Sequence, residues 1–378
     1  MKTTTLFLAG FLATVAACSV GTPSSSDAPP AVAAGFDPLD TMSPASSKAD
    51  ALALPLQVVT LSTRDIAAIE RFYVDGLGMT LSGPVEVGAD VQARQAELWD
   101  MPEGLGWQEF HLTRPGADIH GRPAMAIRVL VVDQDVPSVH DSWDSRSYGG
   151  FSMGFPNKDQ IGLDAKIRGL GFGARASSAE IYDVPRTDGS MYSIHETIFD
   201  APDHVHAVGI DRVGMLPLGA VDSDTGLGGP GYSAQVIDDS DSVLAFYTGV
   251  LGLEVRRDSI FKSAGSDGAM ALPDGTEFRF TILMSPGHGP GGHMLFVDFT
   301  NIDGIDSGVA PRVPHLGIGM WSYPVTSLDE VLRRAREAGT PIVHGPVEFA
   351  DPLHGKVRAA TLLAPNEFLI EVFETVAP

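Results

Sequence analysis

Glu109 and His111 are the first candidate site residues, because a carboxylate and an imidazole can bind a metal or move a proton. One residue separates them in an apolar, strand-like segment. Alternate residues of a strand point to the same face, so both side chains are predicted to share one face. His195, which shares a strand face with Ser193, could join them in an unorthodox metal site. The alternative is that all three are hydrogen-bonded polar residues lining a cavity.

Other reactive residues lie in less favourable contexts. His204 and His206 would share one strand face, but the Gly-, Pro- and Asp-rich sequence that follows predicts an interdomain linker with solvated histidines. His288 and His293 flank a Gly-Pro-Gly-Gly loop, which fixes ligand geometry poorly. The segment 150–154 matches the G-x-S-x-G pattern, but no helix start follows its serine directly, so a serine hydrolase is not expected.

Composition excludes one class of partner. The chain has 48 Asp and Glu against 25 Lys and Arg, which gives a formal net charge of −23. Nucleic-acid binding needs clustered basic residues that displace counterions, so no nucleic-acid partner is expected. A hydrophobic fraction of 44% is ordinary for a globular protein. The composition therefore predicts a globular protein that can bury a core, and it excludes nucleic acid as the partner.

The N-terminus has the pattern of an export signal. A lysine at position 2 precedes the apolar run 6–15, which is too short to span a bilayer. The sequence 15–18, Val-Ala-Ala-Cys, resembles a lipobox, in which the cysteine is lipidated after cleavage. Cys18 is the only cysteine, so it cannot form an internal disulfide. The alternative is an ordinary signal peptide with an incidental cysteine.

These features predict a signal peptide at 1–17, followed at 18–52 by lipidated Cys18 and a disordered Ser- and Pro-rich tether. The lipobox resemblance implies an exported protein that contacts the membrane only through its lipid. Ser19 after the cysteine implies sorting to the outer membrane, facing the periplasm or the cell surface.

An internal duplication organises the rest of the chain. The segment 72–79, Phe-Tyr-Val-Asp-Gly-Leu-Gly-Met, recurs at 246–253 as Phe-Tyr-Thr-Gly-Val-Leu-Gly-Leu. Strand-like and helix-like segments follow both copies in parallel order, which predicts four strand–helix–strands units, two in each half. One unit exposes an apolar sheet face and must pair to bury it. We therefore predict an α+β chain with two domains, at 53–202 and 231–378, joined by a linker at 203–230.

The repeated Phe-Tyr-x-x-x-Leu-Gly signature and the closing segment 364–371 resemble the vicinal oxygen chelate superfamily, which includes glyoxalase I, extradiol dioxygenases and bleomycin-resistance proteins. The resemblance covers about 54–375. It implies tandem βαβββ modules paired into two cupped-sheet domains around a divalent metal. In that family the metal binds vicinal oxygens of the substrate and stabilises an enediolate or activates dioxygen. His, Gln or Glu ligands lie on the first and last strands of the units.

The family pattern is matched only in part. Glu371 falls at the closing-strand ligand position and is the candidate catalytic residue. The first-strand histidine expected in the same unit falls near Met320, and His315 lies five residues earlier. The other expected ligand positions carry Val58, Ser152, Ser193 and Tyr232. Three or more ligands are normally needed for a divalent site.

Two functions remain open at this point. The first, slightly favoured, is a metal-assisted lyase, isomerase or dioxygenase that acts on a small oxygenated molecule and uses Fe, Mn, Zn or Ni. Glu109, His111, His195, His315 and Glu371 are its candidate metal ligands. The second is a non-catalytic small-molecule-binding protein that keeps the cup and has lost the metal. Glyoxalase activity proper is not expected, because its glutathione adduct is chiefly cytoplasmic.

Overall fold

The fold is known from a computed structural model, which describes residues 47, 51–118, 121–185 and 190–376. The predicted signal peptide and Cys18 lie outside these residues. Ala51 and Leu52, predicted to end the tether, are buried and belong to the folded body. No helix in the described ranges has the length and hydropathy needed to cross a membrane.

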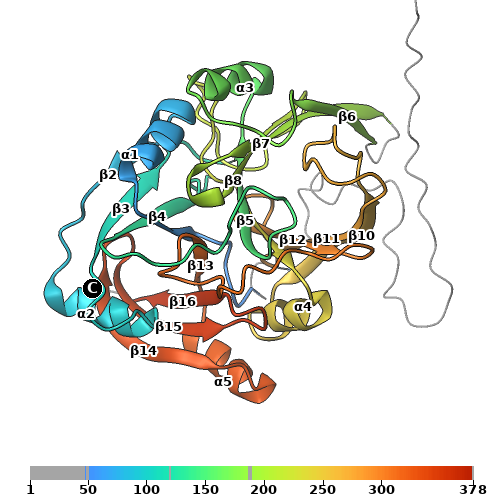
Figure 1. The fold of residues 1–378 in the computed structure, drawn as a ribbon. Helices are drawn as coiled ribbons and strands as arrows, with labels where there is room; N and C mark the ends of the chain where they lie inside the picture. The colour runs from blue at the N-terminus through green and yellow to red at the C-terminus, as the bar shows by residue number, and fades with distance from the viewer. Residues whose placement is uncertain (1–46, 48–50, 119–120, 186–189, 377–378) are drawn as a thin grey trace, which may run out of the picture.

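Four successive units each contain a first strand, a helix and three further strands (Figure 1). Unit 1 contains β1 (Val58–Thr63), α1 (Ile66–Ile69) continued by the π-helix η2 (Glu70–Gly76), β2 (Thr80–Ser82), α2 (Ala89–Leu98), β3 (Trp107–Thr113) and β4 (Ala126–Val132). Unit 2 contains β5 (Gly149–Pro156), α3 (Gln160–Gly169), β6 (Glu180–Pro185), β7 (Met191–Asp200), the 3-10 turn η3 (Pro202–His204) and β8 (His206–Arg212). Unit 3 contains β9 (Tyr232–Ile237), α4 (Ser240–Gly249), β10 (Glu254–Lys262), β11 (Glu277–Met284) and β12 (His293–Phe299). Unit 4 contains β13 (Gly317–Pro324), α5 (Leu328–Ala338), β14 (Ile342–Asp351), β15 (Gly355–Leu363) and β16 (Leu369–Thr375). The predicted tandem βαβββ modules are confirmed.

The helix after each first strand begins at the same kind of cap. The side chains of Asp65, Asp159, Asp239 and Ser327 each accept a hydrogen bond from the backbone N–H three residues later. Such a cap satisfies a backbone donor that the helix leaves free. The sequence 327–330, Ser-Leu-Asp-Glu, has the capping-box pattern, and Ser327 caps α5 as this pattern predicts. The four caps also mark equivalent positions in the four units.

The first strands pair across the two halves of the chain. β1 of unit 1 runs antiparallel to β13 of unit 4, with Val58 opposite Ser322. β5 of unit 2 runs antiparallel to β9 of unit 3, with Gly154 opposite Tyr232. One 16-stranded sheet results, which curves into two eight-stranded cups joined where β5 and β13 pair at Gly150 and Ile318. The outer cup has the strand order β14-β15-β16-β13-β1-β4-β3-β2, and the inner cup has the order β6-β7-β8-β5-β9-β12-β11-β10.

The predicted sheet pairing of consecutive units is therefore wrong. Consecutive units instead pack through their helical sides: the rings of Tyr73 and Phe155 join units 1 and 2 with centroids 6.0 Å apart, and Tyr247 and Trp321 join units 3 and 4 at 6.1 Å. Burial of an apolar sheet face requires a partner, but the pattern of one unit does not specify which other unit supplies it. The predicted linker 203–230 is also too long, because β8 lies inside it and closes unit 2. Whether 53–202 and 231–378 can fold as separate domains stays a prediction.

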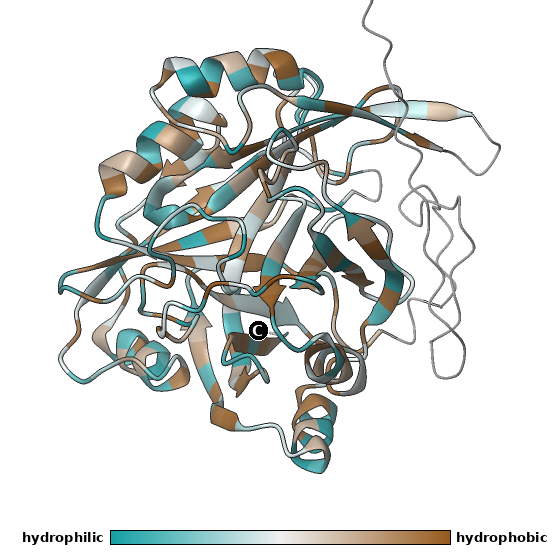
Figure 2. Ribbon diagram, turned by 45° about the vertical axis from the view of Figure 1, so that its right-hand side comes forward, coloured by the Kyte–Doolittle hydropathy of each residue, from teal (hydrophilic) through white to brown (hydrophobic). Residues whose placement is uncertain are grey.

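The core has three parts. One apolar cluster lies between the sheets and the helices and contains residues of all four units, among them Tyr73, Phe155, Tyr247 and Trp321. Separate clusters fill the inner cup and the outer cup. In Figure 2 the helices carry both hydrophobic and hydrophilic residues, as expected for helices that cover a sheet on one side only. The central cluster ties the two cups into one body.

The close approach of the two first strands in the inner cup yields a prediction. A Cβ atom on Gly154 would lie 2.0 Å from a ring carbon of Tyr232. We expect Gly154→Ala to lower the free energy of unfolding by about 1–3 kcal/mol, because the ring must move in a filled cup. Urea denaturation measures the effect. Gly169→Ala is the matched control, since nothing lies within 4 Å of its added Cβ. An unchanged stability of Gly154→Ala would contradict the β5–β9 register.

Candidate functional site

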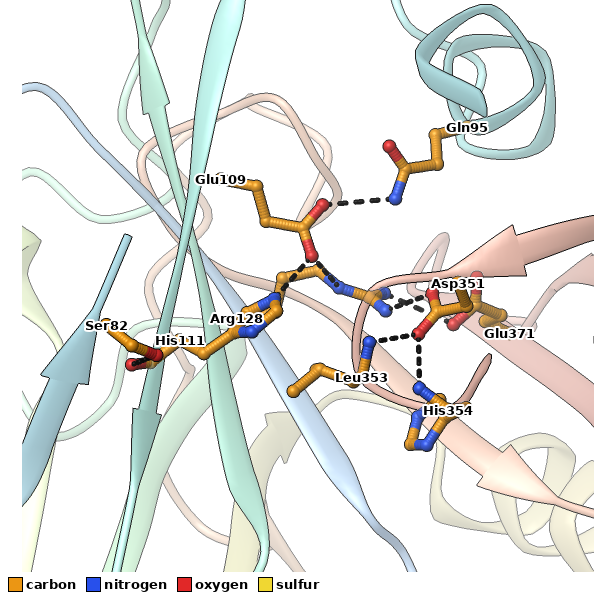
Figure 3. Close-up of polar contacts among 9 residues, drawn as sticks. All are labelled: Ser82, Gln95, Glu109, His111, Arg128, Asp351, Leu353, His354 and Glu371. Atoms are coloured by element: carbon orange, nitrogen blue, oxygen red, sulfur yellow. Dashed lines mark hydrogen bonds and ion pairs between the residues drawn. The ribbon is translucent and has the colours of Figure 1, made fainter. Parts of the chain in front are cut away.

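A buried arginine lies at the floor of the outer cup (Figure 3). Arg128 is in the middle of β4, where Ile127 and Val129 face the central cluster and Arg128 faces the cup. Its side chain is 0% exposed. Charged side chains are almost never fully buried unless they are paired. The arginine therefore requires partners inside the cup.

Three carboxylates surround the Arg128 guanidinium. Glu109 accepts from Nε at 3.2 Å, Asp351 accepts from Nη2 at 2.6 Å, and Glu371 accepts from Nη1 at 3.4 Å. Glu109 comes from β3 of unit 1, whereas Asp351 ends β14 and Glu371 lies on β16 of unit 4. The guanidinium thus joins the two units of the outer cup at its centre.

Further hydrogen bonds fix the carboxylates. His111 Nε2 donates to Glu109 Oε1 at 2.6 Å. The backbone N–H groups of Leu353 and His354 donate to Asp351 Oδ1 at 2.8 and 3.0 Å. Both oxygens of Asp351 and Oε1 of Glu109 are therefore engaged by donors.

Helix α2 covers this cluster from above. Gln95 donates from Nε2 to Glu109 Oε2 at 3.0 Å, and Trp99 at the end of the helix donates from Nε1 to Glu371 Oε1 at 2.9 Å. The Arg128 guanidinium also lies 5.0 Å from the centre of the Trp99 ring, within the range of a cation–π contact. α2 lies beside β14 in Figure 1 and connects β2 to β3. The helix thus closes the cup and excludes water from the ion pairs.

The charges perturb one another in the expected directions. Burial raises the pKa of Glu109, but the Arg128 charge and the His111 hydrogen bond outweigh it and hold this pKa below its usual value. Burial lowers the pKa of Arg128, but the charges of Asp351, Glu109 and Glu371 raise it overall. Glu109 is therefore an ionised ion-pair partner, with no tendency to act as a proton donor near neutral pH.

Four hydroxyl groups on the cup side of the sheet lack a hydrogen-bond partner within the described part of the chain: Thr60, Ser62, Ser322 and Thr361. All four residues are 0% exposed. Thr60 is paired with Arg128 across β1 and β4, and both Ser322 and Thr361 are paired with Glu371. Buried polar groups normally have a partner, so unsatisfied hydroxyls beside the ion pairs indicate that the floor can take a further polar group.

A comparison of equivalent positions in units 1 and 4 shows whether their residues could ligate a metal. Arg128 pairs with Thr60, five residues before the Asp65 cap, and Glu371 pairs with Ser322, five residues before the Ser327 cap. Arg128 therefore occupies in unit 1 the position that Glu371 occupies in unit 4. A cation stands where the family pattern implies a second carboxylate ligand.

The remaining ligand positions implied by the family pattern do not supply the missing metal ligands. In the outer cup the first strands carry Val58, which has no ligating atom, and Met320, whose soft thioether favours Cu(I) over the divalent cations of such sites. In the inner cup the closing-strand positions are Val208 and Leu295, opposite Gly154 and Ala234. Nowhere in the described ranges do three His, Cys, Asp or Glu residues form a group that could hold a metal ion. The residues present do not fit the divalent metal that the resemblance implies.

The structure brings together three of the predicted site residues, Glu109, His111 and Glu371. His195 lies on β7 of the inner cup, where it pairs with Ile181 and Asp211, so it cannot complete a site with Glu109. Ser193 shares that strand and is not at a closing-strand position, because unit 2 closes with β8.

Other predicted residues have structural roles. His315 lies before β13, and its Nδ1 donates to the Ala310 carbonyl at 2.8 Å, so it does not reach the floor of the outer cup. Ser152 lies inside β5, and α3 starts eight residues later at Gln160, so no nucleophile elbow forms. His206, predicted in a solvated linker, begins β8 and is buried.

Arg128, Asp351, Gln95 and Trp99 were not recognised from the sequence. Arg128 carried a usable signal, because a charged residue in the middle of the apolar segment 125–132 must be buried with a partner. The other three have no local signal in the sequence. Gln95 lies in α2, Trp99 lies at the end of α2, and Asp351 lies at the end of β14.

Two histidines in the inner cup yield a pH prediction. Burial lowers the pKa of His293 to about 3, and the same cause lowers the pKa of His206 to about 3. In the unfolded chain each of these imidazoles binds a proton as pH falls through about 6.5, whereas in the folded chain they stay neutral. The free energy of unfolding therefore falls as pH falls below that value. We expect His293→Gln to reduce the loss of stability between pH 7 and pH 5 by about 1–2 kcal/mol. Urea denaturation at both pH values, with His344→Gln as control, measures this. An equal loss in wild type and His293→Gln would contradict the burial of a neutral imidazole.

A cavity of about 300 Å³ borders the inner cup. Its polar side is formed by Asp144, Ser145, Arg146 and Arg175, and its apolar side by Met270 to Pro273. Leu272 of this wall belongs to the apolar cluster of the inner cup. The volume is in the range of small-molecule pockets, at their lower end of about 300 Å³.

Comparisons with known proteins agree with this architecture. Residues 229–356 match the sequence model of the family described as Glyoxalase/Bleomycin resistance protein/Dioxygenase superfamily. Glyoxalase I from Zea mays superposes with a TM-score of 0.53 at 13% identity, over 85% of this chain and 92% of that chain. A variant of the same maize enzyme gives a TM-score of 0.54 at 12% identity, over 86% of this chain and 95% of that chain. No curated protein matches the sequence. At these identities the structural likeness shows the fold alone.

Proposed function

We propose that this chain belongs to the Glyoxalase/Bleomycin resistance protein/Dioxygenase superfamily, whose sequence model matches residues 229–356, and that it binds a small molecule without a metal ion and without catalysing a metal-assisted reaction. The observation that carries the proposal is the Arg128–Glu371 ion pair at equivalent positions of the two outer-cup units. A carboxylate held by a guanidinium and by Trp99 is not available to a divalent cation.

The alternative expected from the sequence, a metal-assisted lyase, isomerase or dioxygenase, is less well supported. Such an enzyme needs three or more ligands and an open coordination position. The outer cup offers Glu371 alone at the implied positions and is closed by α2. The inner cup has apolar residues at its closing-strand positions. The cavity whose wall includes Leu272 of the inner-cup cluster has room for a small ligand.

The proposal includes the predicted setting of the protein. Lipidation at Cys18 would hold it at a membrane surface after export, with the two cups displayed on a tether. The small molecule would then be captured outside the cytoplasm. These points are supported by the N-terminal sequence pattern.

Metal analysis of the purified chain tests the proposal. We expect Fe, Mn, Zn and Ni each to be far below one ion per chain, before and after reconstitution with the four metals, because ligands are too few. Glu371→Ala should give the same values as wild type, and the exposed Glu348→Ala is the matched control. Near-stoichiometric metal in wild type that is lost only in Glu371→Ala would overturn the proposal.

A further inference from the structure

The walls of the cavity of about 300 Å³ beside the inner cup are formed by connections and not by strands. The connection between β4 and β5 supplies 144–146, and the connection between α3 and β6 supplies Arg175. The connection between β10 and β11 supplies Ser266 and 270–273. Because these connections come from units 1 to 3, the cavity forms only when the units are assembled. It shares no residue with the ion pairs at the floor of the outer cup.

Contacts between the connections fix the shape of this cavity. The hydroxyl of Ser145, which is buried, donates to the Met270 carbonyl oxygen at 2.7 Å and ties the first connection to the third. Leu272 is anchored in the apolar cluster of the inner cup. Ala271 between them has a φ of 49°, a left-handed conformation that costs a non-glycine residue free energy. The cavity is therefore formed before a ligand arrives, which lowers the cost of binding.

The polar wall of the cavity has N–H donors that no described protein group uses. Arg146 donates to Asp144 through Nε at 3.0 Å and through Nη2 at 2.9 Å, and its Nη1 has no acceptor among the described residues. Arg175 contacts Asp200 through Nε and Nη2, both at 2.7 Å, and the Trp143 carbonyl oxygen through Nη1. A guanidinium has five N–H donors. These contacts occupy two donors of Arg146 and three of Arg175, so donors of both arginines remain for a ligand.

The lining of the cavity carries an excess of positive charge. Arg146 and Arg175 are both lining residues, whereas Asp144 is the only carboxylate among the described residues that line the cavity. The hydrogen bonds from Arg146 hold the pKa of Asp144 below its usual value, so this carboxyl is ionised at neutral pH. Asp200, which pairs with Arg175, is not a lining residue. Two guanidiniums against one carboxylate favour an anion, in a chain whose formal net charge is −23.

We infer that this cavity binds a small organic carboxylate whose apolar body lies against Met270, Ala271 and Leu272. The carboxylate accepts from the unused N–H groups of Arg146 and Arg175, because the planar guanidinium matches the two oxygens of a carboxylate. The apolar body of the ligand loses its contact with water on the opposite wall. The inference rests on the proposed function, and it adds the place where the small molecule binds and the chemical class of that molecule.

Isothermal titration calorimetry with three probes tests the inference. Phenylacetate has a carboxylate and an apolar ring, phenylacetamide has nearly the same shape without the charge, and acetate lacks the ring. We expect one phenylacetate per chain, bound at least about tenfold more tightly than either of the other probes, because the charged hydrogen bonds and the buried ring each contribute that much. If phenylacetamide binds as tightly as phenylacetate, the inference is wrong and the proposed function still stands. Absence of phenylacetate binding also overturns the inference.

Two substitutions with opposite expected effects locate the bound probe. Arg146→Gln removes donors and should weaken phenylacetate binding by about tenfold. Asp144→Asn removes the neighbouring negative charge and should strengthen binding by about threefold. The two side chains are 31% and 33% exposed, so neither substitution is expected to unfold the chain. Arg279→Gln is the matched control, because Arg279 also pairs through two nitrogens with one carboxylate, Asp258, and lies outside the cavity lining.

The directions of these two effects decide the outcome. The inference fails if Arg146→Gln binds phenylacetate as tightly as wild type and Arg279→Gln do, or if Asp144→Asn binds it no more tightly than wild type. A general loss of structure would weaken binding in both variants, so opposite effects exclude that explanation. Near-stoichiometric metal in the wild type would contradict the proposed function instead, and metal analysis detects it independently of the three probes.

Discussion

Replacing Arg128 by methionine is expected to lower the free energy of unfolding by about 3–5 kcal/mol in chelator at neutral pH. Methionine fills much of the same volume but leaves Glu109, Asp351 and Glu371 buried without a counter-charge. Removal of one partner from a buried ion-pair network costs far more than the pair contributes, because the remaining charges stay desolvated. Urea denaturation of wild type and Arg128→Met measures the difference.

The pH dependence of this difference has a definite sign. In wild type the pKa of Glu109 is lowered, so its stabilising contribution is present above the unfolded carboxyl pKa of about 4.3 and is lost as pH falls through the folded value. Without Arg128, the carboxyls lose the charge that keeps them ionised, and protonation relieves their repulsion. The deficit of Arg128→Met should therefore shrink between pH 7 and pH 4. Arg279→Met, a partly exposed arginine, is the control. A deficit under about 1 kcal/mol, the value of an ordinary surface pair, would contradict the role of Arg128.

Division of the chain at its midpoint has an equally large expected effect. A fragment of residues 51–230 contains units 1 and 2, and a fragment of 231–378 contains units 3 and 4. Each lacks the partner of both its first strands, because β1 pairs with β13 and β5 pairs with β9. We expect neither fragment alone to unfold cooperatively as a monomer, and an equimolar mixture to recover the cooperative transition of the full chain.

Circular dichroism, urea denaturation and the mass of the species in solution measure this outcome. Full-length protein cleaved at 230 after folding is the control, because its strands are already paired. Monomeric, cooperative folding of 51–230 by itself would show that the consecutive units form an independent domain, as the sequence predicts. It would then follow that helix-side contacts such as Tyr73–Phe155 stabilise a half-chain without its sheet partner.

Local features of the fold were predictable from the sequence. The recurrence of 72–79 at 246–253 revealed the duplication, and a cap at Ser327 located a helix to the residue. These signals depend on residues close together in the chain. The exchange of partners between halves leaves no such local signal, because any first strand with a buried face satisfies the same pattern. Sequence therefore predicted the units and not their pairing.

The candidate site was predictable where the strand face alone determines which side chains point into the cup. Glu109 and His111 share a cup-facing side of β3, and Glu371 lies on the closing strand, as predicted. His195 was placed with them because its strand was assigned to the same cup, an error that follows from the wrong pairing. Arg128 decides the chemistry of the cup, and its importance depends on Asp351, 223 residues away.

The relation between Arg128 and Glu371 has a consequence for the evolution of such cups. In a cup assembled from two identical polypeptides, every substitution would occur on both sides of the symmetry axis. The two equivalent closing-strand positions would then always carry the same residue, either two arginines or two glutamates. Fusion of the units into one polypeptide lets a single codon change on one side only. An attractive guanidinium–carboxylate contact across the former axis is thus open to a fused gene and closed to a homodimer.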